Sequence, residues 1–286
     1  MKLFRGIRRN LFILLMVVFS LLAAACGDDA TEAGSGEETA GCDPLPTKVD
    51  GTLTVATGEP VFPPWMIDDD PTNGQGYESA LVYALADELG IESIEWVRTT
   101  FEEAISAAEK DYDFNIQQYS ITIERDDVVD FSDGYYQVEQ AIIGAADNPA
   151  ASATSLADLA ALRLGAASGT TSLNYIDDVI QPETPAAPYD DNATAKAAFD
   201  AGQVDAIVFD LPTAYYITAV EIPEASIIGV LPRSGEPEEL GMLFEEGSPL
   251  VACVNEALAT LDSNGTLDDL EETWLNDGGN IPSLSE

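Results

Sequence analysis

The sequence predicts an α/β fold built from open, mostly parallel sheets that are divided between two lobes. Strand-like and helix-like segments alternate along the chain, as an open sheet with helices on both faces requires. About 240 residues follow an N-terminal leader and tether, a length that suggests one large or two medium-sized domains. Two extended apolar runs, over residues 138–146 and 240–244, lack a helical partner. We expect these two runs to cross between the lobes.

Local signals support the individual elements. A helix predicted over residues 77–89 ends at Gly90, a natural C-terminal cap. A second helix is predicted over 101–110, with Thr99 or Thr100 as its N-cap and acidic residues in its first turn. Further strands are expected over residues 52–56, 94–97, 162–166 and 204–208, and further helices from Thr171 and over 193–201.

The N-terminus has the features of an export signal. Four basic residues precede the apolar stretch 11–22, which is too short to span a bilayer comfortably. The stretch ends at Leu22-Ala-Ala-Ala-Cys26, which resembles a bacterial lipobox, although Ala23 stands where leucine is usual. We therefore expect residues 1–25 to be a lipoprotein signal peptide and Cys26 to be lipidated; an ordinary secretory signal is the alternative. Residues 26–50 are expected to form an acidic tether, since residues 27–41 contain no large apolar side chain.

The charge balance limits the partners. The chain has 11 basic and 52 acidic residues, and the leader holds four of the basic residues and none of the acidic ones. So acidic a protein repels nucleic acid and anionic lipid headgroups, which excludes both as partners. The run Asp68-Asp69-Asp70 lacks the alternating spacing of a calcium loop, and we interpret it as a solvated surface. Because the chain has no histidine, a Ser-His-Asp triad and a His-ligated metal are impossible, and we expect neither a metal nor a cofactor.

Three cysteines are present. If Cys26 carries a lipid, Cys42 and Cys253 remain as an even pair in an oxidising compartment, where they are expected to form a disulfide. This bond would connect the two ends of the folded region. The alternative is a pair of unrelated buried thiols.

The most informative motif runs from Asp113 to Arg125 and on to the segment Asp130-Phe-Ser-Asp-Gly-Tyr-Tyr136. It reads as a strand that opens into a polar loop, with an arginine five residues after Ser120. A guanidinium presents donors in a fork that matches a carboxylate, and a serine hydroxyl can add another donor beside it. The alternative is a surface arginine at the start of a short helix that Thr122 caps.

This motif resembles the corresponding stretch of the solute-binding proteins of amino-acid ABC importers, an extracytoplasmic family that includes the glutamine- and histidine-binding proteins. The resemblance extends over residues 52–275 and implies the type II periplasmic-binding-protein-like fold with a two-strand hinge. It implies lobe 1 over residues 51–141 and 239–286, and lobe 2 over 142–238. It also implies a receptor, expected to be monomeric, that is lipid-anchored on the outer face of the cytoplasmic membrane and delivers a polar L-amino acid to an ABC permease.

The resemblance also assigns site residues. Ser120 and Arg125 would hold the ligand's α-carboxylate from lobe 1, and Thr170 with Thr171 would complete this clamp from lobe 2, in a turn before a helix. Asp210 would receive the α-ammonium. The rings of Phe62 and Phe101 would flank the ligand's side chain. Gln117 and Gln118 stand where the family often has small residues, so their amides would bind a polar side chain.

Three questions stay open at the level of sequence. Glu59 could select a cationic side chain as readily as the glutamines could select a neutral polar one. Trp65 is expected to pack in the core and not to contact the ligand. The same fold occurs in dehydratases and lytic transglycosylases, which need a positioned general acid, and in sensor modules, which normally continue into a membrane helix. The filled clamp positions, and the end of the sequence at Glu286, favour the transport receptor.

Overall fold

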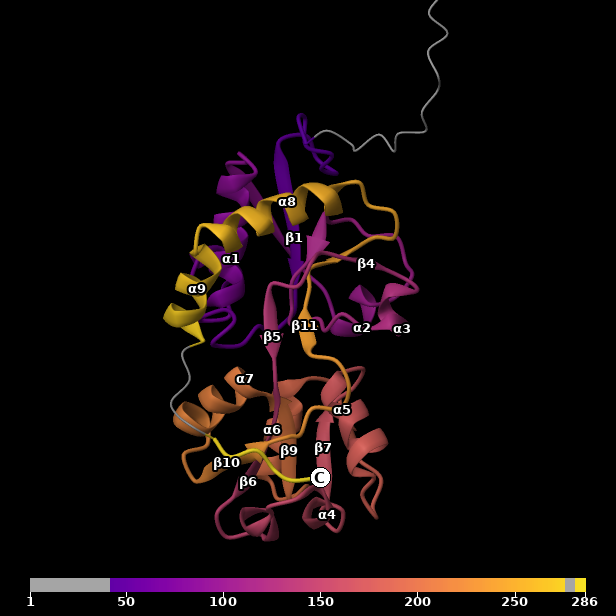
Figure 1. Ribbon diagram of the computed structural model, residues 1–286, viewed down its shortest axis with the longest axis vertical. Coiled ribbons are helices and arrows are strands. Elements are labelled where there is room, and N and C mark those ends of the chain that lie inside the picture. The colour runs from indigo at the N-terminus through magenta and orange to yellow at the C-terminus, as the bar shows by residue number, and fades with distance from the viewer. Residues whose placement is uncertain (1–41, 276–280) are drawn as a thin grey trace, which may run out of the picture. The chain divides into compact units, whose positions relative to one another are not determined.

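The computed structural model describes residues 42–275 and 281–286, which fold into two lobes joined by a pair of strands (Figure 1). Each lobe contains an open five-stranded sheet with helices packed against it. The predicted signal peptide and the lipidation site at Cys26 lie outside the described residues. Among the helices that the structure describes, none combines the length and the apolar character needed to cross a membrane.

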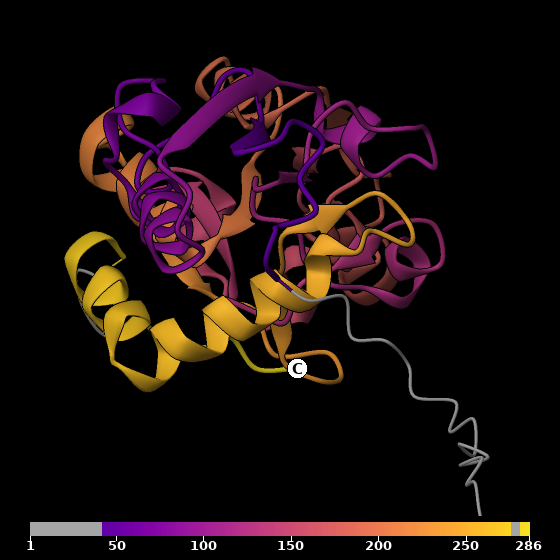
Figure 2. The same ribbon diagram turned by 90° about the horizontal axis from the view of Figure 1, so that it is seen from above.

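Lobe 1 is built on a sheet with the strand order β2-β1-β3-β12-β4. Its strands are β1 (Thr52–Thr57), β2 (Ser93–Arg98), β3 (Phe114–Asn115), β4 (Asp130–Phe131) and β12 (Leu243–Phe244). Its helices are η1 (Pro71–Asn73), α1 (Tyr77–Glu88), α2 (Phe101–Ala104), α3 (Ile123–Asp126), α8 (Leu250–Ser263) and α9 (Thr266–Trp274). Figure 2 shows α8 and α9 beside α1 along one side of this lobe.

Lobe 2 is built on a sheet with the strand order β10-β6-β9-β7-β8. Its strands are β6 (Gln140–Ala145), β7 (Leu164–Ala167), β8 (Ala187–Tyr189), β9 (Ala206–Asp210) and β10 (Ala225–Val230). Its helices are η2 (Pro149–Ser152), α4 (Leu156–Leu159), α5 (Thr171–Tyr175), η3 (Ile176–Ile180), α6 (Asn192–Asp200), α7 (Leu211–Tyr216) and η4 (Ile217–Glu221).

Both sheets mix parallel and antiparallel pairing. In lobe 1, β1 pairs in parallel with β2 and β3, and in lobe 2, β7 pairs in parallel with β8 and β9. The strands β12 and β6 run antiparallel to their neighbours. These two strands enter their sheets directly from the crossings between the lobes, without the helical crossover that makes neighbouring strands parallel.

The crossings form a small sheet of their own. The strand β5 (Tyr136–Val138) pairs antiparallel with β11 (Glu238–Leu240), so that Val138 lies opposite Glu238 (Figure 1). Each apolar run that the sequence analysis expected to cross between the lobes thus consists of a short paired strand followed by a strand of a lobe sheet. The polypeptide passes between the lobes through these two paired strands, and it crosses once more between α9 and residues 281–286. The paired strands are the natural position of a hinge.

Each lobe has its own apolar core. In lobe 1, residues of β1 and α1 pack with residues of α8, and Leu45, in the segment assigned to the tether, packs against this core. In lobe 2, the sheet is covered on both faces by separate clusters. The last described residues also lie on lobe 2, although the sequence analysis assigned all of 239–286 to lobe 1. Leu284 packs into its core, and Ser283 forms a bridge with Val230.

The helix expected over residues 101–110 is shorter than the sequence analysis predicted, because α2 ends at Ala104. Its start is as expected, with a capping box between Thr100 and Glu103. The Ser106 hydroxyl donates to the carbonyl of Glu103 at 2.7 Å, and the Lys110 ammonium donates to the same carbonyl at 3.0 Å. These bonds satisfy the carbonyl that a continuing helix would use, so the helix stops.

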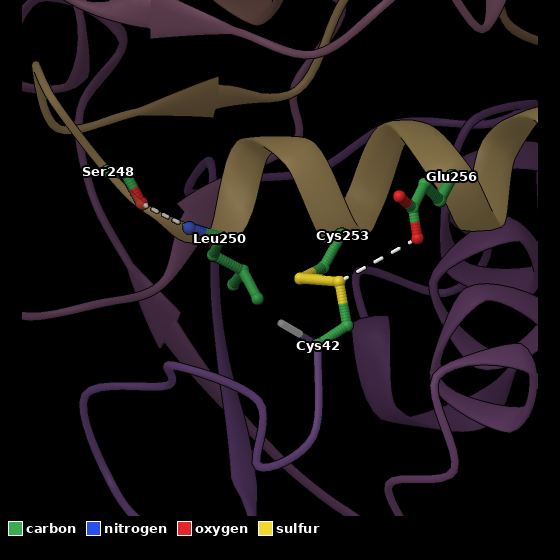
Figure 3. The surroundings of a disulfide bond; sticks show 5 residues. All are labelled: Cys42, Ser248, Leu250, Cys253 and Glu256. Atoms are coloured by element: carbon green, nitrogen blue, oxygen red, sulfur yellow. Dashed lines mark hydrogen bonds between the residues drawn. A yellow bond between two sulfur atoms is a disulfide. The ribbon is translucent and has the colours of Figure 1, made fainter. Parts of the chain in front are cut away.

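The disulfide expected from the sequence is present between Cys42 and Cys253. Figure 3 shows Cys253 on α8 directed toward Cys42, which lies at the start of the described chain. The bond closes a loop across a sequence separation of 211 residues. It therefore connects the N-terminal segment to the last part of lobe 1.

Replacing both Cys42 and Cys253 with alanine should lower the free energy of unfolding by about 2–5 kcal/mol, because the unfolded chain regains the freedom of a long loop. Urea denaturation of the oxidised protein and the double variant measures the difference. A reducing agent should destabilise the wild type and leave the variant unchanged. A loss below about 0.5 kcal/mol would contradict a stabilising role for the bond.

Candidate ligand-binding site

The candidate site is a cavity of about 210 Å³ whose walls come from both lobes. All eight residues that the sequence analysis proposed for ligand binding line it: Phe62, Phe101, Gln118, Ser120, Arg125, Thr170, Thr171 and Asp210. The first five belong to lobe 1 and the last three to lobe 2. The fold thus brings together groups that lie up to 148 positions apart in the sequence.

Arg125 lies in α3, the short helix that the alternative interpretation predicted, and Thr122 accepts a hydrogen bond from its backbone amide. Its side chain is nevertheless buried, with 8% exposure. One terminal nitrogen donates to the carbonyl of Ser120 at 2.6 Å, and the other donates to the carbonyl of Gly169 in lobe 2 at 3.0 Å. Burial lowers the pKa of Arg125, while Tyr119 and nearby carboxylates oppose this shift. Since a guanidinium keeps its proton in proteins, the cavity has a fixed positive charge.

Asp210 ends β9 on the opposite wall. Its Oδ1 accepts a hydrogen bond from the side-chain amide of Gln140 at 2.7 Å. Burial raises the pKa of Asp210 to about 7, and the negative charge of Glu238 adds to this shift, while Gln140 and Arg125 oppose it. A cation that binds beside Asp210 therefore favours its ionised form. Asp205, which directly precedes β9, pairs instead with Arg163 at 2.6 Å.

Gln118 is held by Glu78, a residue that the sequence analysis did not single out. The backbone amide of Gln118 donates to one oxygen of Glu78 at 2.7 Å, and its side-chain amide donates to the other. The Tyr135 hydroxyl also donates to Glu78, at 2.6 Å. Burial raises the pKa of Glu78 to about 7, although these hydrogen bonds oppose the shift. Glu78 thus fixes the loop that contains Gln118, whose φ of 51° is unusual for a residue other than glycine.

Aromatic rings form part of the cavity wall. Phe101 stacks on Tyr119 with ring centroids 4.6 Å apart, and the guanidinium carbon of Arg125 lies 5.4 Å from the Phe101 centroid. Phe62 lines the same cavity. Trp65 is fully buried in the core, as expected, and its indole nitrogen donates to Thr213 of lobe 2 at 2.8 Å.

The hydroxyl groups of the predicted clamp have partners inside the protein. Thr170 caps α5 by accepting from the Leu173 amide, and it donates to the carbonyl of Ala167 at 2.7 Å. The hydroxyls of Ser120 and Thr171 both donate to Glu238 of β11. Glu238 and Gln140 are thus further polar groups of the site region that the sequence analysis missed. Gln140 lies in the run 138–146, which was interpreted only as a crossing between the lobes.

Acidic residues exceed basic ones in the cavity wall. Glu59, Asp190 and Asp191 line the cavity together with Asp210, whereas Arg125 is the one basic residue among the described lining residues. Asp191 also caps α6 by accepting from the Thr194 amide at 2.7 Å. Within residues 42–275 and 281–286, no group of acidic and cysteine side chains is arranged to hold a metal ion.

A cavity between two lobes, with opposite charges on its two walls, is the site of a two-lobed binding protein. Residues 53–277 match the family described as bacterial extracellular solute-binding proteins, family 3. The chain belongs to this family, whose members serve amino-acid ABC importers. It is therefore an exported solute-binding protein and not an enzyme.

Individual relatives agree with this assignment. The L-cystine-binding protein TcyJ of Escherichia coli (strain K12) is 27% identical over 229 residues, which cover 79% of this chain and 83% of TcyJ. The structure of an ancestral arginine-binding protein bound to arginine has 32% identity and a TM-score of 0.67, covering 78% of this chain and 98% of that one. A mutant of ArgBP from T. maritima has 28% identity and a TM-score of 0.67, covering 79% and 96%.

Proposed function

We propose that this protein is a lipid-anchored receptor that captures a polar L-amino acid in the cavity between its lobes and delivers it to an ABC permease. The observation that carries the proposal is the pair Arg125 and Asp210, one on each wall of the same cavity. An amino acid is a zwitterion, so its carboxylate complements the guanidinium and its ammonium complements the carboxylate. The lipobox-like segment ending at Cys26 supports anchoring by lipid.

The remaining charges favour particular side chains. Once Arg125 and Asp210 are matched by the α-carboxylate and the α-ammonium, the acidic residues Glu59, Asp190 and Asp191 remain in the cavity wall. They repel an acidic side chain and attract a cationic one, while Gln117 and Gln118 can bind a neutral polar one. Similar proteins bind such ligands: structures of an ancestral arginine-binding protein were solved with bound arginine and with bound glutamine. We therefore expect cationic and neutral polar amino acids to bind and acidic ones to be rejected.

Replacing Arg125 with alanine should weaken binding of the captured amino acid by about 2–5 kcal/mol, or roughly 30-fold to several-thousand-fold, because one partner of a buried charge pair is lost. Thermal-shift screening of the roughly 20 common amino acids first identifies the one that the protein captures. Calorimetry then gives the affinities of the wild type and the variant. The matched control is Arg233→Ala, which removes an exposed arginine of lobe 2. A loss below about threefold in the Arg125 variant would contradict the carboxylate clamp.

Affinity should also fall as the pH is lowered through about 7, because an ammonium binds the ionised form of Asp210 and this residue has a pKa of about 7. Below that value the loss should approach about tenfold per pH unit. Calorimetry between about pH 8 and pH 5 measures it. The variant Asp210→Asn should bind weakly at every pH and show no such slope. A wild-type affinity that stays constant over this range would contradict the ammonium role of Asp210.

A further inference from the structure

Glu238 contacts one hydroxyl group from each lobe. Its Oε1 accepts a hydrogen bond from Ser120 at 2.5 Å and from Thr171 at 2.6 Å. Ser120 lies in the polar loop after β3 in lobe 1, and Thr171 is the first residue of α5 in lobe 2. Glu238 itself lies in β11, one of the two strands that join the lobes. A single carboxylate oxygen therefore holds both hydroxyls.

The carboxylate decides where the two hydroxyl protons point. The oxygens of Ser120 and Thr171 are 3.4 Å from each other, farther than either is from Glu238. Hydrogen bonds to a charged acceptor are shorter and about twice as strong as neutral ones, so each hydroxyl donates to Glu238. A hydroxyl has one proton and two acceptor lone pairs. Once the proton is committed to Glu238, the group can only accept from a molecule in the cavity.

The direction of the two hydroxyl protons determines which ligand group Ser120 and Thr171 can bind. A carboxylate only accepts hydrogen bonds and an ammonium only donates them. Ser120 and Thr171 both line the cavity, so in this arrangement they complement an ammonium and not a carboxylate. Their hydroxyls thus differ from the donors that the sequence analysis expected beside Arg125.

Gln140 places Glu238 close to Asp210. Its side-chain nitrogen donates to Oδ1 of Asp210 at 2.7 Å and lies 3.4 Å from both carboxylate oxygens of Glu238. The two carboxylates therefore lie on either side of one amide group. The acceptors held by Glu238 and the carboxylate of Asp210 thus belong to the same part of the site.

We propose that Glu238 is a positioning residue that sets the hydroxyls of Ser120 and Thr171 as acceptors for the α-ammonium of the bound amino acid, beside Asp210. The inference rests on the proposed function and deepens it. Recognition of the amino group then uses three acceptors, whereas the carboxylate is left to Arg125 and backbone amides. The site therefore discriminates strongly against an analogue that keeps the carboxylate but lacks the α-amino group.

The test compares such a pair of probes by calorimetry. L-Arginine is paired with δ-guanidinovalerate, which lacks only the α-amino group, and L-glutamine is paired in the same way with glutaramate. In Glu238→Ala both hydroxyl protons are released and can turn toward a carboxylate. We expect the preference of the wild type for the amino acid over its deaminated partner to fall by about tenfold or more. A purely structural defect would weaken both probes equally and leave the preference unchanged.

Three further variants make the result specific. Glu238→Gln keeps a carbonyl oxygen that can accept from both hydroxyls, so its preference should stay within about threefold of the wild type. Glu239→Ala changes the next residue of β11, whose side chain is exposed, and should leave both affinities unchanged. Thr171→Val removes one acceptor and should weaken only the amino acid, which tests the inference even if Glu238→Ala does not fold.

The outcomes separate the inference from the proposed function. If the wild type binds an amino acid and the preference persists in Glu238→Ala, or if Thr171→Val weakens both probes equally, the inference is overturned and the receptor function stands. If the wild type binds none of the common amino acids, the proposed function fails and the inference fails with it.

Discussion

The guanidinium of Arg125 is the group on which both walls of the cavity depend. It is a buried cation that donates to a carbonyl in each lobe, and burying a charge is costly unless anions and acceptors surround it. Asp210 and Glu238 supply the compensating negative charge. Because these groups come from lobe 1, lobe 2 and the connecting strands, the charge balance of the site exists only when all three parts are assembled. The α-carboxylate and α-ammonium of an amino acid add one charge of each sign and so leave this balance unchanged.

The connecting strands β5 and β11 allow the angle between the two lobes to change. Among the described residues, the strands that pair between the two large sheets are β5 and β11, and this short ladder offers few backbone hydrogen bonds to resist a change in the angle between the lobes. Side-chain contacts then set the preferred angle, among them the bond from Trp65 to Thr213 and the bond from Arg125 to Gly169. A ligand can shift this angle only through contacts that it makes with both lobes at once.

The parts of this arrangement that follow local rules could be predicted from the sequence. Alternating strand and helix signals predicted the α/β class, and the even cysteine pair predicted the bond between Cys42 and Cys253. The cavity residues were found because a family motif keeps them in a fixed order. Glu238, Gln140 and Glu78 could not be found in this way, because their partners are distant: Glu238 and Ser120 are 118 residues apart. An acidic residue in an acidic chain gives no local sign that it accepts hydrogen bonds from two distant hydroxyls. The end of α2 was missed for a similar reason, since the Lys110 contact forms only in the folded loop.

If one amino acid is held by both lobes together, binding must draw the lobes toward each other. Small-angle X-ray scattering of the purified protein, with and without a saturating amino acid, measures this change. We expect a smaller radius of gyration in the bound protein, because Arg125 and Asp210 can contact the same zwitterion only when the lobes lie against each other. An unchanged scattering profile, with binding confirmed by calorimetry on the same sample, would contradict it.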